Sequence, residues 1–553
     1  MEDLKGQLTL RGVLVGCIGC AVITASSAYI ALKMGALPWP IVFAALVSLF
    51  FLKAVSKGSA SLNEANVTHT VMSAGAMVAG GLAFTIPGAW MLGLADEISL
   101  AHMLVVSLAG VAVGLVCTAL LRSYFVDEAE LEFPIGQAAA QTLVAGDAGG
   151  SMGKKLFGAM GVAGAFAVLR DALGVIPSMV LALPIPGVTF GIYLSPMMLS
   201  IGYLVGTGAV LAWFAGAVFG NFGIVVAGSA AGFWDVSAGQ SLVSSLGMGV
   251  MMGCGFAVVF KDVAPRAISA LRCSSARSAV SSAFGLTAGF AGLIVAAVVV
   301  ALCMGLSLSP VASVVLVLLA FVATSMSAQS VGQTGIDPME IFGLIALLLI
   351  AAFSDVSQVQ LFFIAAVVAV ACGLAGDVMN DFKAGRMLGT NPRAQIVGQA
   401  IGAVLGAFVS VAVMLVLLKA YGADAFGPGG AFVAAQASVV ATMVSGIPCV
   451  PAFLIGLALG FALHCLRLPS MMIGLGIYLP FYLSLTAFLG CMAKLAYDWV
   501  GKRRLADLDE AERAEKEAAR QETGLVVASG LLGGESIVGI VIALVLTFSG
   551  FIL

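Results

Sequence analysis

Few ionisable side chains lie in or beside the long apolar stretches of this sequence, and these are the residues that could do chemistry. Glu64 and His69 lie five residues apart at the start of one stretch, where an acid and an imidazole could share a proton. Asp337 and Glu340 lie between two further stretches, and Asp377 lies at the end of another. An ionisable group in a membrane is costly unless it faces a cavity or the interior of a helical bundle. Each of these residues is therefore a candidate for binding an ion or a substrate.

The same residues also have structural interpretations, which the sequence leaves open. Glu64 is an acid at the start of a helix, where the helix dipole favours negative charge. Asp337 precedes a proline, which is typical of a helix N-cap. Asp377 and Asp381 lie close to Lys383 and would suit a solvated helix face.

Two further pairs have the spacing of one helix face. Gln329 and Gln333 could bind the amide groups of a peptide, and Tyr478 and Tyr482 could contact a substrate or anchor a helix at the membrane interface. The segment Gly335–Pro338 interrupts a helix, and a broken helix exposes amides and carbonyls that can coordinate an ion or a substrate terminus.

The composition indicates the elements that must position these residues. Of 553 residues, 61% are apolar and 10% are charged, whereas a soluble domain carries about 25% charged residues. We therefore predict an all-α polytopic membrane protein. The net charge of −3 gives no sign of nucleic-acid binding, and the sequence has neither a P-loop nor an HExxH motif. Its 10 cysteines are scattered without the spacing of a metal site, so we expect no cofactor, no metal and no enzyme activity.

A span needs roughly 20 apolar residues, which predicts about 16–17 transmembrane helices. They lie near residues 10–32, 38–55, 69–93, 101–121, 153–176, 187–207, 209–229, 240–260, 279–304, 309–328, 338–354, 360–378, 394–418, 432–446, 450–465, 469–492 and 527–550. The segment MEDLKGQLTLR leads into the first of them, which we interpret as a span and not a removed signal peptide. Glycines four residues apart, such as Gly12 and Gly16 or Gly402 and Gly406, predict close helix packing.

Lys and Arg in short loops predict the orientation, because they favour the cytoplasmic side. The strongest cluster lies between Lys261 and Arg277, and the N-terminus with Lys5 falls on the same side. We predict an inner-membrane protein with a cytoplasmic N-terminus. Its expected organisation is a first transmembrane half at 1–260, a basic cytoplasmic loop at 261–278, a second half at 279–495, a charged cytosolic helical connector at 496–526 and a final transmembrane helix at 527–553.

An internal repeat relates residues 21–42 to residues 321–342. The two segments share identical residues at matching positions: Val22/Val322, Thr24/Thr324, Ser27/Ser327, Ala28/Ala328, Gly35/Gly335, Pro38/Pro338 and Ile41/Ile341. By the charge rule the first copy starts in the cytoplasm and the second starts outside, so the copies should be antiparallel. Inverted repeats with matching helix breaks are typical of secondary transporters. The segment Glu132–Leu143 is too short for a span, and we predict a re-entrant or broken helix there.

Several motifs resemble those of the oligopeptide transporter (OPT) superfamily, which includes the yellow stripe-like metal-chelate transporters. They are LTLRGVLVG with AYIALKMGALPWPIV, Asn63-Glu64 with HTVMSAGAMVAGGLAFTIPG, GIYLSPMMLSIGYLVG, LGTNPRAQIVGQAIGA and LPSMMIGLGIYLP. They occur in the family's order over about residues 8–495 and outside the last span. The family's FPEG sequence reads Phe133-Pro134-Ile135-Gly136 here, so a coupling acid in that motif does not carry over.

The resemblance implies a prokaryotic-type importer of small peptides or peptide-like metal chelates that is coupled to protons. Two alternatives stay open: an ion-coupled transporter of another small solute, such as an anion or a nucleobase, and a membrane enzyme or scaffold. The expected partners are the substrate, a coupling ion such as H⁺ and the lipid bilayer, and the sequence does not decide whether the chain forms a homo-oligomer.

Overall fold

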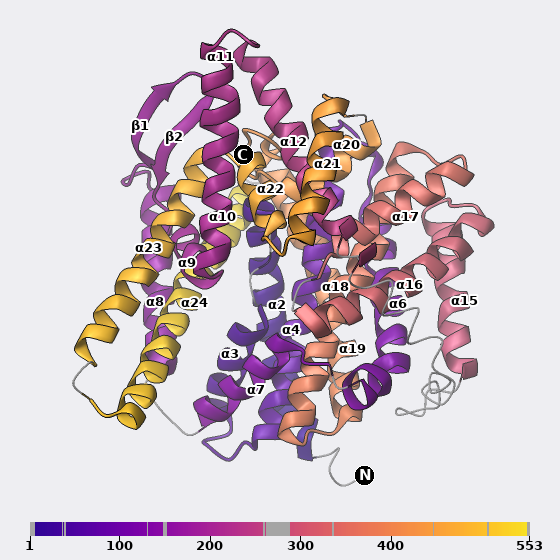
Figure 1. The fold of residues 1–553 in the computed structure, drawn as a ribbon. Coiled ribbons are helices and arrows are strands. Elements are labelled where there is room, and N and C mark those ends of the chain that lie inside the picture. Colours follow the sequence, from indigo (N-terminus) through magenta and orange to yellow (C-terminus); the bar gives the residue numbers. More distant parts are fainter. Residues whose placement is uncertain are drawn as a thin grey trace. The chain divides into compact units, whose positions relative to one another are not determined.

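The computed structural model describes residues 6–35, 37, 40–129, 131–147, 152–257, 260–261, 288–334, 337–445, 447–505 and 508–549. Figure 1 shows the chain as a ribbon with helices and strands labelled. These elements belong to two compact units. Unit 1 comprises Met1–Gly149 and Val258–Ser445, and unit 2 comprises Gly150–Ala257 and Gly446–Leu553. Each unit thus takes one segment from each predicted half of the sequence. Most of the basic loop at 261–278, together with Lys5, Pro38 and Gly335, lies outside the described residues.

The predicted fold class is confirmed: this is an all-α polytopic membrane protein. Among the described residues, 8 helices are long and apolar enough to cross a membrane, and five apolar helices are shorter. Several predicted spans differ from the structure. The segment 187–207 is a β-strand followed by a short helix, and 469–492 is divided at Pro480 into two helices. The predicted boundary at 526 falls inside one continuous 40-residue helix.

Unit 1 contains helices that precede and follow the basic loop. They are α2 (Leu10–Met34), α3 (Pro40–Val55), α4 (Leu62–Ala83), α5 (Ile86–Met91), α6 (Leu100–Arg122), α7 (Pro134–Asp147), α15 (Ala288–Gly305), α16 (Pro310–Thr334), α17 (Met339–Phe353), α18 (Gln358–Leu388), α19 (Pro392–Tyr421) and α20 (Ala435–Ser445). A π-helical turn at Ser123–Glu128 and short 3₁₀ turns at Ala95–Glu97 and Ala423–Ala425 connect them. Local signals define their ends: Ser61 caps the start of α4, and Gly35 ends α2 at a positive φ of 64° that favours glycine.

Two helix pairs in unit 1 run parallel. Gly12 and Gly16 of α2 pack against Thr68 and Val71 of α4, so both helices start at the same end. In the second copy, the hydroxyl of Ser327 in α16 donates to the carbonyl of Cys372 in α18, and Val331 lies against Gly376. The pair α16 and α18 therefore repeats the pair α2 and α4.

The two copies run in opposite directions, as the repeat predicts. Asn66 at the start of α4 donates to Thr390 just after the end of α18, whereas Gly81 near the end of α4 packs against Val370. Helices α4 and α18 are therefore antiparallel. Since each is parallel to its own partner, α2 and α16 are antiparallel too, which is the arrangement of an inverted repeat.

Helix α7 begins at the FPIG motif and has only 14 residues. It packs against α3 and α18, and the amide of Gly136 donates to Asn380 Oδ1 of α18 at 3.0 Å. Before it, the amide of Phe133 donates to the carbonyl of Gly332 near the end of α16. The segment is a short packed helix entered through irregular backbone, in agreement with the prediction of a broken helix and not a full span.

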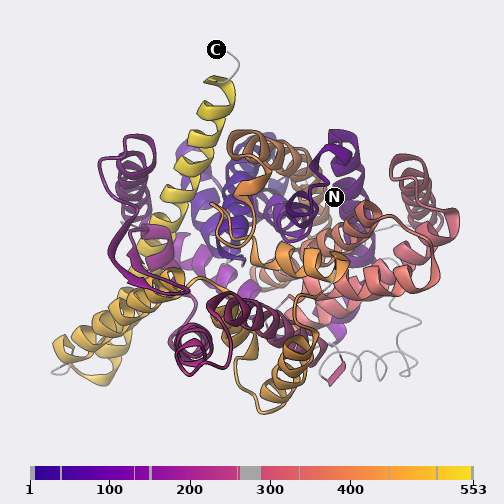
Figure 2. The same cartoon turned by 90° about the horizontal axis from the view of Figure 1, so that it is seen from above.

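Unit 2 contains the remaining helices and a β-hairpin. Its elements are α8 (Met152–Ala167), β1 (Met179–Ile185), β2 (Val188–Tyr193), α9 (Pro196–Leu204), α10 (Thr207–Val218), α11 (Gly228–Ala230), α12 (Val236–Ala257), α21 (Val450–Cys465), α22 (Ser470–Tyr478), α23 (Phe481–Arg504) and α24 (Glu510–Ser549). π-helical turns extend α8 over Val168–Ala172 and α10 over Phe219–Ala227. The antiparallel hairpin pairs Met179 with Tyr193 and Ile185 with Val188. Figure 2 shows α24 as the long yellow helix that ends the chain.

Unit 2 also contains a repeat, formed by α9 with α10 and by α22 with α23. Gly202 of α9 packs against the carbonyl of Ala487 in α23, and Gly476 of α22 packs against the carbonyl of Trp213 in α10. The same number of residues separates Gly202 from Gly476 and Trp213 from Ala487, so the two contacts are equivalent. The contact of Gly490 with Leu199 recurs at that offset as the contact of Gly216 with Ile473. A side chain at any of these glycines would overlap backbone atoms, so the glycines permit this close packing. The short helices α9 and α22 are therefore equivalent elements of the two copies.

Candidate functional site

The candidate site lies in unit 1, where α4 and α18 cross. Asp377 and Asp381 are one helical turn apart on α18, so they lie on the same face. Their residues are 2% and 0% exposed. The prediction that these two acids lie on a solvated helix face is therefore wrong. Helix α18 continues to Leu388, and this face packs against α4.

Asp381 is the centre of a polar group drawn from three helices. Nε2 of His69 in α4 lies 3.7 Å from Asp381 Oδ1, and the hydroxyl of Ser73 donates to Oδ2 at 3.2 Å. From α19, Nε2 of Gln399 donates to the same oxygen at 3.4 Å, and Nε2 of Gln395 donates to the Asp381 carbonyl at 2.7 Å. The site residues therefore come from both copies of the repeat.

Asp337 extends this group to the break before α17. Its Oδ1 accepts a hydrogen bond of 2.6 Å from Ser327, and its carboxylate lies against Gly376, the residue next to Asp377. We refer to Asp337, Asp377, Asp381 and His69 as the acid cluster. The predicted helix interruption thus brings its aspartate to the acids of α18.

Several carboxylate oxygens of the acid cluster have no hydrogen-bond donor among the described residues. They are both oxygens of Asp377, Oδ2 of Asp337 and Oδ1 of Asp381, and all are inaccessible to solvent. Burying a carboxylate without donors costs several kcal/mol, so its charge must be compensated by a bound proton or cation. In the described part of the chain, no group of three or more His, Cys, Asp or Glu residues could hold a metal ion.

Glu64 lies elsewhere on α4 and has different partners. Its carboxylate accepts hydrogen bonds of 2.7 Å from both Nε and Nη2 of Arg11, and a 2.5 Å bond from the hydroxyl of Thr9. It therefore ties the start of α4 to the start of α2. His69 faces Asp381 instead of Glu64, since five residues along a helix turn the side chain by roughly 140°. The expected proton sharing between Glu64 and His69 is not what the structure contains.

The other predicted site residues are distributed as follows. Glu340 is buried in the first turn of α17, three residues after Asp337, and Gln329 is buried in α16. The side chain of Gln333 lies outside the described part of the structure. Tyr478 ends α22 in unit 2, where its backbone packs against Gly247 of α12. Glu340 and Gln329 thus lie in unit 1 with the acid cluster, and Tyr478 belongs to a separate unit.

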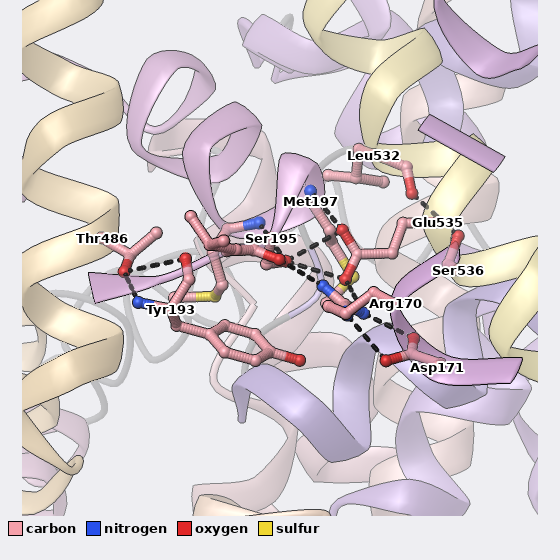
Figure 3. Close-up of polar contacts among 11 residues, drawn as sticks. Arg170, Asp171, Tyr193, Ser195, Met197, Thr486, Leu532, Glu535 and Ser536 are labelled. Carbon is pink, nitrogen blue, oxygen red and sulfur yellow. Dashed lines mark hydrogen bonds and ion pairs between the residues drawn. The ribbon is translucent and has the colours of Figure 1, made fainter. Parts of the chain in front are cut away.

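A second buried charged group, in unit 2, was not singled out from the sequence (Figure 3). The Glu535 carboxylate in α24 accepts hydrogen bonds from Nη2 of Arg170 at 2.8 Å, from the Ser195 hydroxyl at 2.9 Å and from the amide of Met197 at 2.8 Å. Arg170 also binds the Asp171 carboxylate and the carbonyl of Leu194. Glu535 is a lone acid within the last apolar stretch, and that signal could have identified it.

The chain is similar to one family of transporters over nearly its whole length. The family model described as "OPT oligopeptide transporter protein" matches residues 7–284 and 275–546. The match includes most of α24, whereas the motifs in the sequence ended near residue 495. A Haemophilus influenzae protein whose name assigns it to oligopeptide transport is 26% identical over 605 aligned positions, which cover 94% of this chain and 93% of that protein.

Two rice proteins are similar over shorter regions. The metal-nicotianamine transporter YSL2 is 31% identical over 161 residues, or 27% of this chain and 23% of its own length. The iron-phytosiderophore transporter YSL15 is 28% identical over 136 residues, or 24% of this chain and 20% of its own. With apolar helices long enough to cross a membrane and a family match from end to end, the chain belongs to the OPT oligopeptide transporter family.

Proposed function

We propose that this chain is a secondary transporter that imports small peptides or amino-acid-based metal chelates, and that it couples their entry to protons bound by the acid cluster. One observation carries the coupling: Asp377 and Asp381 are buried on one face of α18, and three of their four carboxylate oxygens have no hydrogen-bond donor among the described residues. A proton-coupled transporter needs such a group because the proton must be bound in one state and released in another.

The geometry suggests a role for each member. Asp381 and His69 come from antiparallel helices of the two repeat copies, and their side chains are 3.7 Å apart. A small relative movement of α4 and α18 would change this distance and thereby the affinity of Asp381 for a proton. Asp337 lies against Gly376, the residue next to Asp377, and these two acids would accept the proton in turn. Glu64 stays a separate candidate for coupling, at the far end of α4 from the helix break.

The substrate class is supported by the relatives. The relative that matches nearly the whole chain is named for oligopeptides, and the rice proteins are named for metal-nicotianamine and iron-phytosiderophore transport. Gln329, Gln333, Glu340 and Tyr478 remain proposed substrate-contacting residues. The protein would lie in the inner membrane, and the basic loops support a cytoplasmic N-terminus.

Uptake into proteoliposomes tests the proposal. Purified protein is reconstituted, a pH gradient that is acidic outside is imposed, and accumulation of labelled trialanine or of iron–nicotianamine is measured. The expected result is accumulation that collapses when a protonophore dissipates the gradient and that unlabelled di- to tetrapeptides or the chelate inhibit. Accumulation that does not depend on the pH gradient would contradict coupling to protons. Inhibition only by nucleobases or inorganic anions would favour the other class of transporter.

A further inference from the structure

The short helices α9 and α22 are equivalent in the two copies of the unit 2 repeat, so their N-termini can be compared. Helix α9 starts Pro196-Met197-Met198, and α22 starts Ser470-Met471-Met472. The constant offset of the glycine contacts makes Met471 equivalent to Met197. In the first copy the amide of Met197 binds Oε2 of Glu535 at 2.8 Å, and the Ser195 hydroxyl binds the same carboxylate (Figure 3). The N-terminus of α9 therefore holds a carboxylate, as expected from the positive end of a helix dipole.

The position that carries this carboxylate can be identified in the second copy. Gly530 and Gly534 of α24 pack against the carbonyls of Leu156 and Met160 in α8. Gly249 and Gly253 of α12 pack in the same way against the carbonyls of Phe453 and Leu457 in α21. The offset is constant within each equivalent helix pair, α12 with α24 and α8 with α21, but differs between the two pairs. Glu535 follows Gly534, and Cys254 follows Gly253. The second copy thus has an uncharged cysteine where the first has an acid.

Cys254 does not replace the carboxylate at the start of α22. Its Sγ lies 3.9 Å from Nδ1 of His464 in α21. The hydroxyl of Ser470, in the first turn of the nine-residue helix α22, has no hydrogen-bond partner among the described residues, although Ser470 is only 1% exposed. A buried hydroxyl without a partner is unfavourable, and a ligand that binds it in another conformation of the protein would remove that cost. Arg467, the equivalent of Arg170, is exposed just before this helix.

We propose that the N-terminus of α22 binds a carboxylate of the transported substrate. The Met471 amide would take the place of the Met197 amide. Because Pro469 stands where Ser195 does in the first copy, the hydroxyl donor would be Ser470, one residue later. The identity of the ligand rests on the proposed function, since peptides and amino-acid-based chelates both carry carboxylates. The internal Glu535 provides the pattern for this binding. At the second terminus a cysteine stands at the position of Glu535, and the Ser470 hydroxyl has no hydrogen-bond partner among the described residues.

Equilibrium binding to the detergent-purified full chain tests this proposal without any gradient. The probes are trialanine, its C-terminal amide, and iron–nicotianamine. We expect the carboxylate form of trialanine to bind at least about tenfold more tightly than the amide, which corresponds to one charge-assisted hydrogen-bond pair. Ser470→Ala should remove most of this preference, because it deletes one donor and leaves the fold of the helix unchanged.

A charge placed at the equivalent of Glu535 gives a matched pair of variants. Cys254→Glu would provide an internal carboxylate to α22 and should weaken carboxylate binding by about tenfold or more, whereas the uncharged Cys254→Gln should stay within about twofold of the wild type. Three results would overturn the proposal. The first is equal affinity of Cys254→Glu and the wild type for the carboxylate, and the second is equal affinity of the wild type for the acid and the amide of trialanine. The third is no binding of either carboxylate probe at 10 mM, which corresponds to about 2.7 kcal/mol of binding free energy. Binding without gradient-driven uptake would instead contradict only the proposed coupling.

Discussion

Replacing Glu535 by alanine removes the acceptor around which three elements of unit 2 converge. The carboxylate is bound by Arg170 at the end of α8, by Ser195 just before α9 and by the amide of Met197 in α9. Its side chain is 2% exposed and that of Arg170 is 1% exposed. The substitution therefore leaves a buried guanidinium with one carboxylate fewer, and a hydroxyl and an amide without an acceptor.

The magnitude follows from these contacts. Breaking a buried ion pair by removing one partner costs about 3–5 kcal/mol. Arg170 keeps its two bonds to Asp171 and the bond to Leu194, so we expect the lower end, about 3 kcal/mol for Glu535→Ala. The Glu535→Gln side chain retains one acceptor oxygen, but its NH₂ group faces a hydrogen-bond donor that then lacks an acceptor. We therefore expect this substitution to lower the free energy of unfolding by about 1–2 kcal/mol.

Unfolding in mixed micelles by titration with a denaturing detergent measures these free energies. The matched control is Glu515→Ala on the same helix, whose exposed side chain should change the free energy of unfolding by less than about 0.5 kcal/mol. If Glu535→Ala destabilised the protein no more than Glu515→Ala, the network would not hold α8, α9 and α24 together, and the reasoning from buried contacts would be refuted.

Two further perturbations test the helix packing of unit 1. Gly406 of α19 lies against the backbone of Gly75 in α4, so Gly406→Leu should destabilise the folded protein by about 1–3 kcal/mol. The measurement is the melting temperature in detergent, which should fall. An unchanged melting temperature would show that the helices do not touch there. Gly136 at the start of α7 lies against the Asn380 carbonyl, so Gly136→Val should displace α7 and lower the rate of uptake. The control Gly158→Val, at an open position on α8, should leave the rate unchanged. Equal rates for the two variants would contradict the packing of α7.

Much of the fold follows from the sequence because the membrane restricts the choices. Long apolar stretches with few charges leave helices as the elements that satisfy their own backbone hydrogen bonds. The matched residues at 21–42 and 321–342 predict a repeat, and the distribution of Lys and Arg predicts that its copies are antiparallel. Composition could not separate the segment at 187–207 into a strand and the short helix α9, since short apolar runs suit both. The helix formers at 510–524 continue without a break into the last apolar stretch, so the charge boundary near 526 is not a structural boundary.

The candidate site was only partly predictable. The spacing of Asp377 and Asp381 shows that they share a helix face, but burial of that face depends on α4 and α19, which pack against it only in the folded chain. The approach of His69 to Asp381 likewise joins residues far apart in the sequence, and no local pattern indicates it. Local spacing instead suggested Glu64 as the partner of His69, although the helical turn separates those side chains.

Gradient-driven uptake by the Asp381→Asn variant tests whether protons bound by the acid cluster drive transport. The amide keeps the size of the side chain and can still accept from Ser73, but it cannot take up a proton. In proteoliposomes with an acidic exterior, Asp381→Asn should lose accumulation against a concentration gradient while retaining exchange of substrate at symmetrical pH. The exposed control Asp355→Asn should retain both, and Glu64→Gln shows whether the ion pair at the start of α4 also contributes. Full accumulation by Asp381→Asn, with the pH dependence of the wild type, would contradict the account.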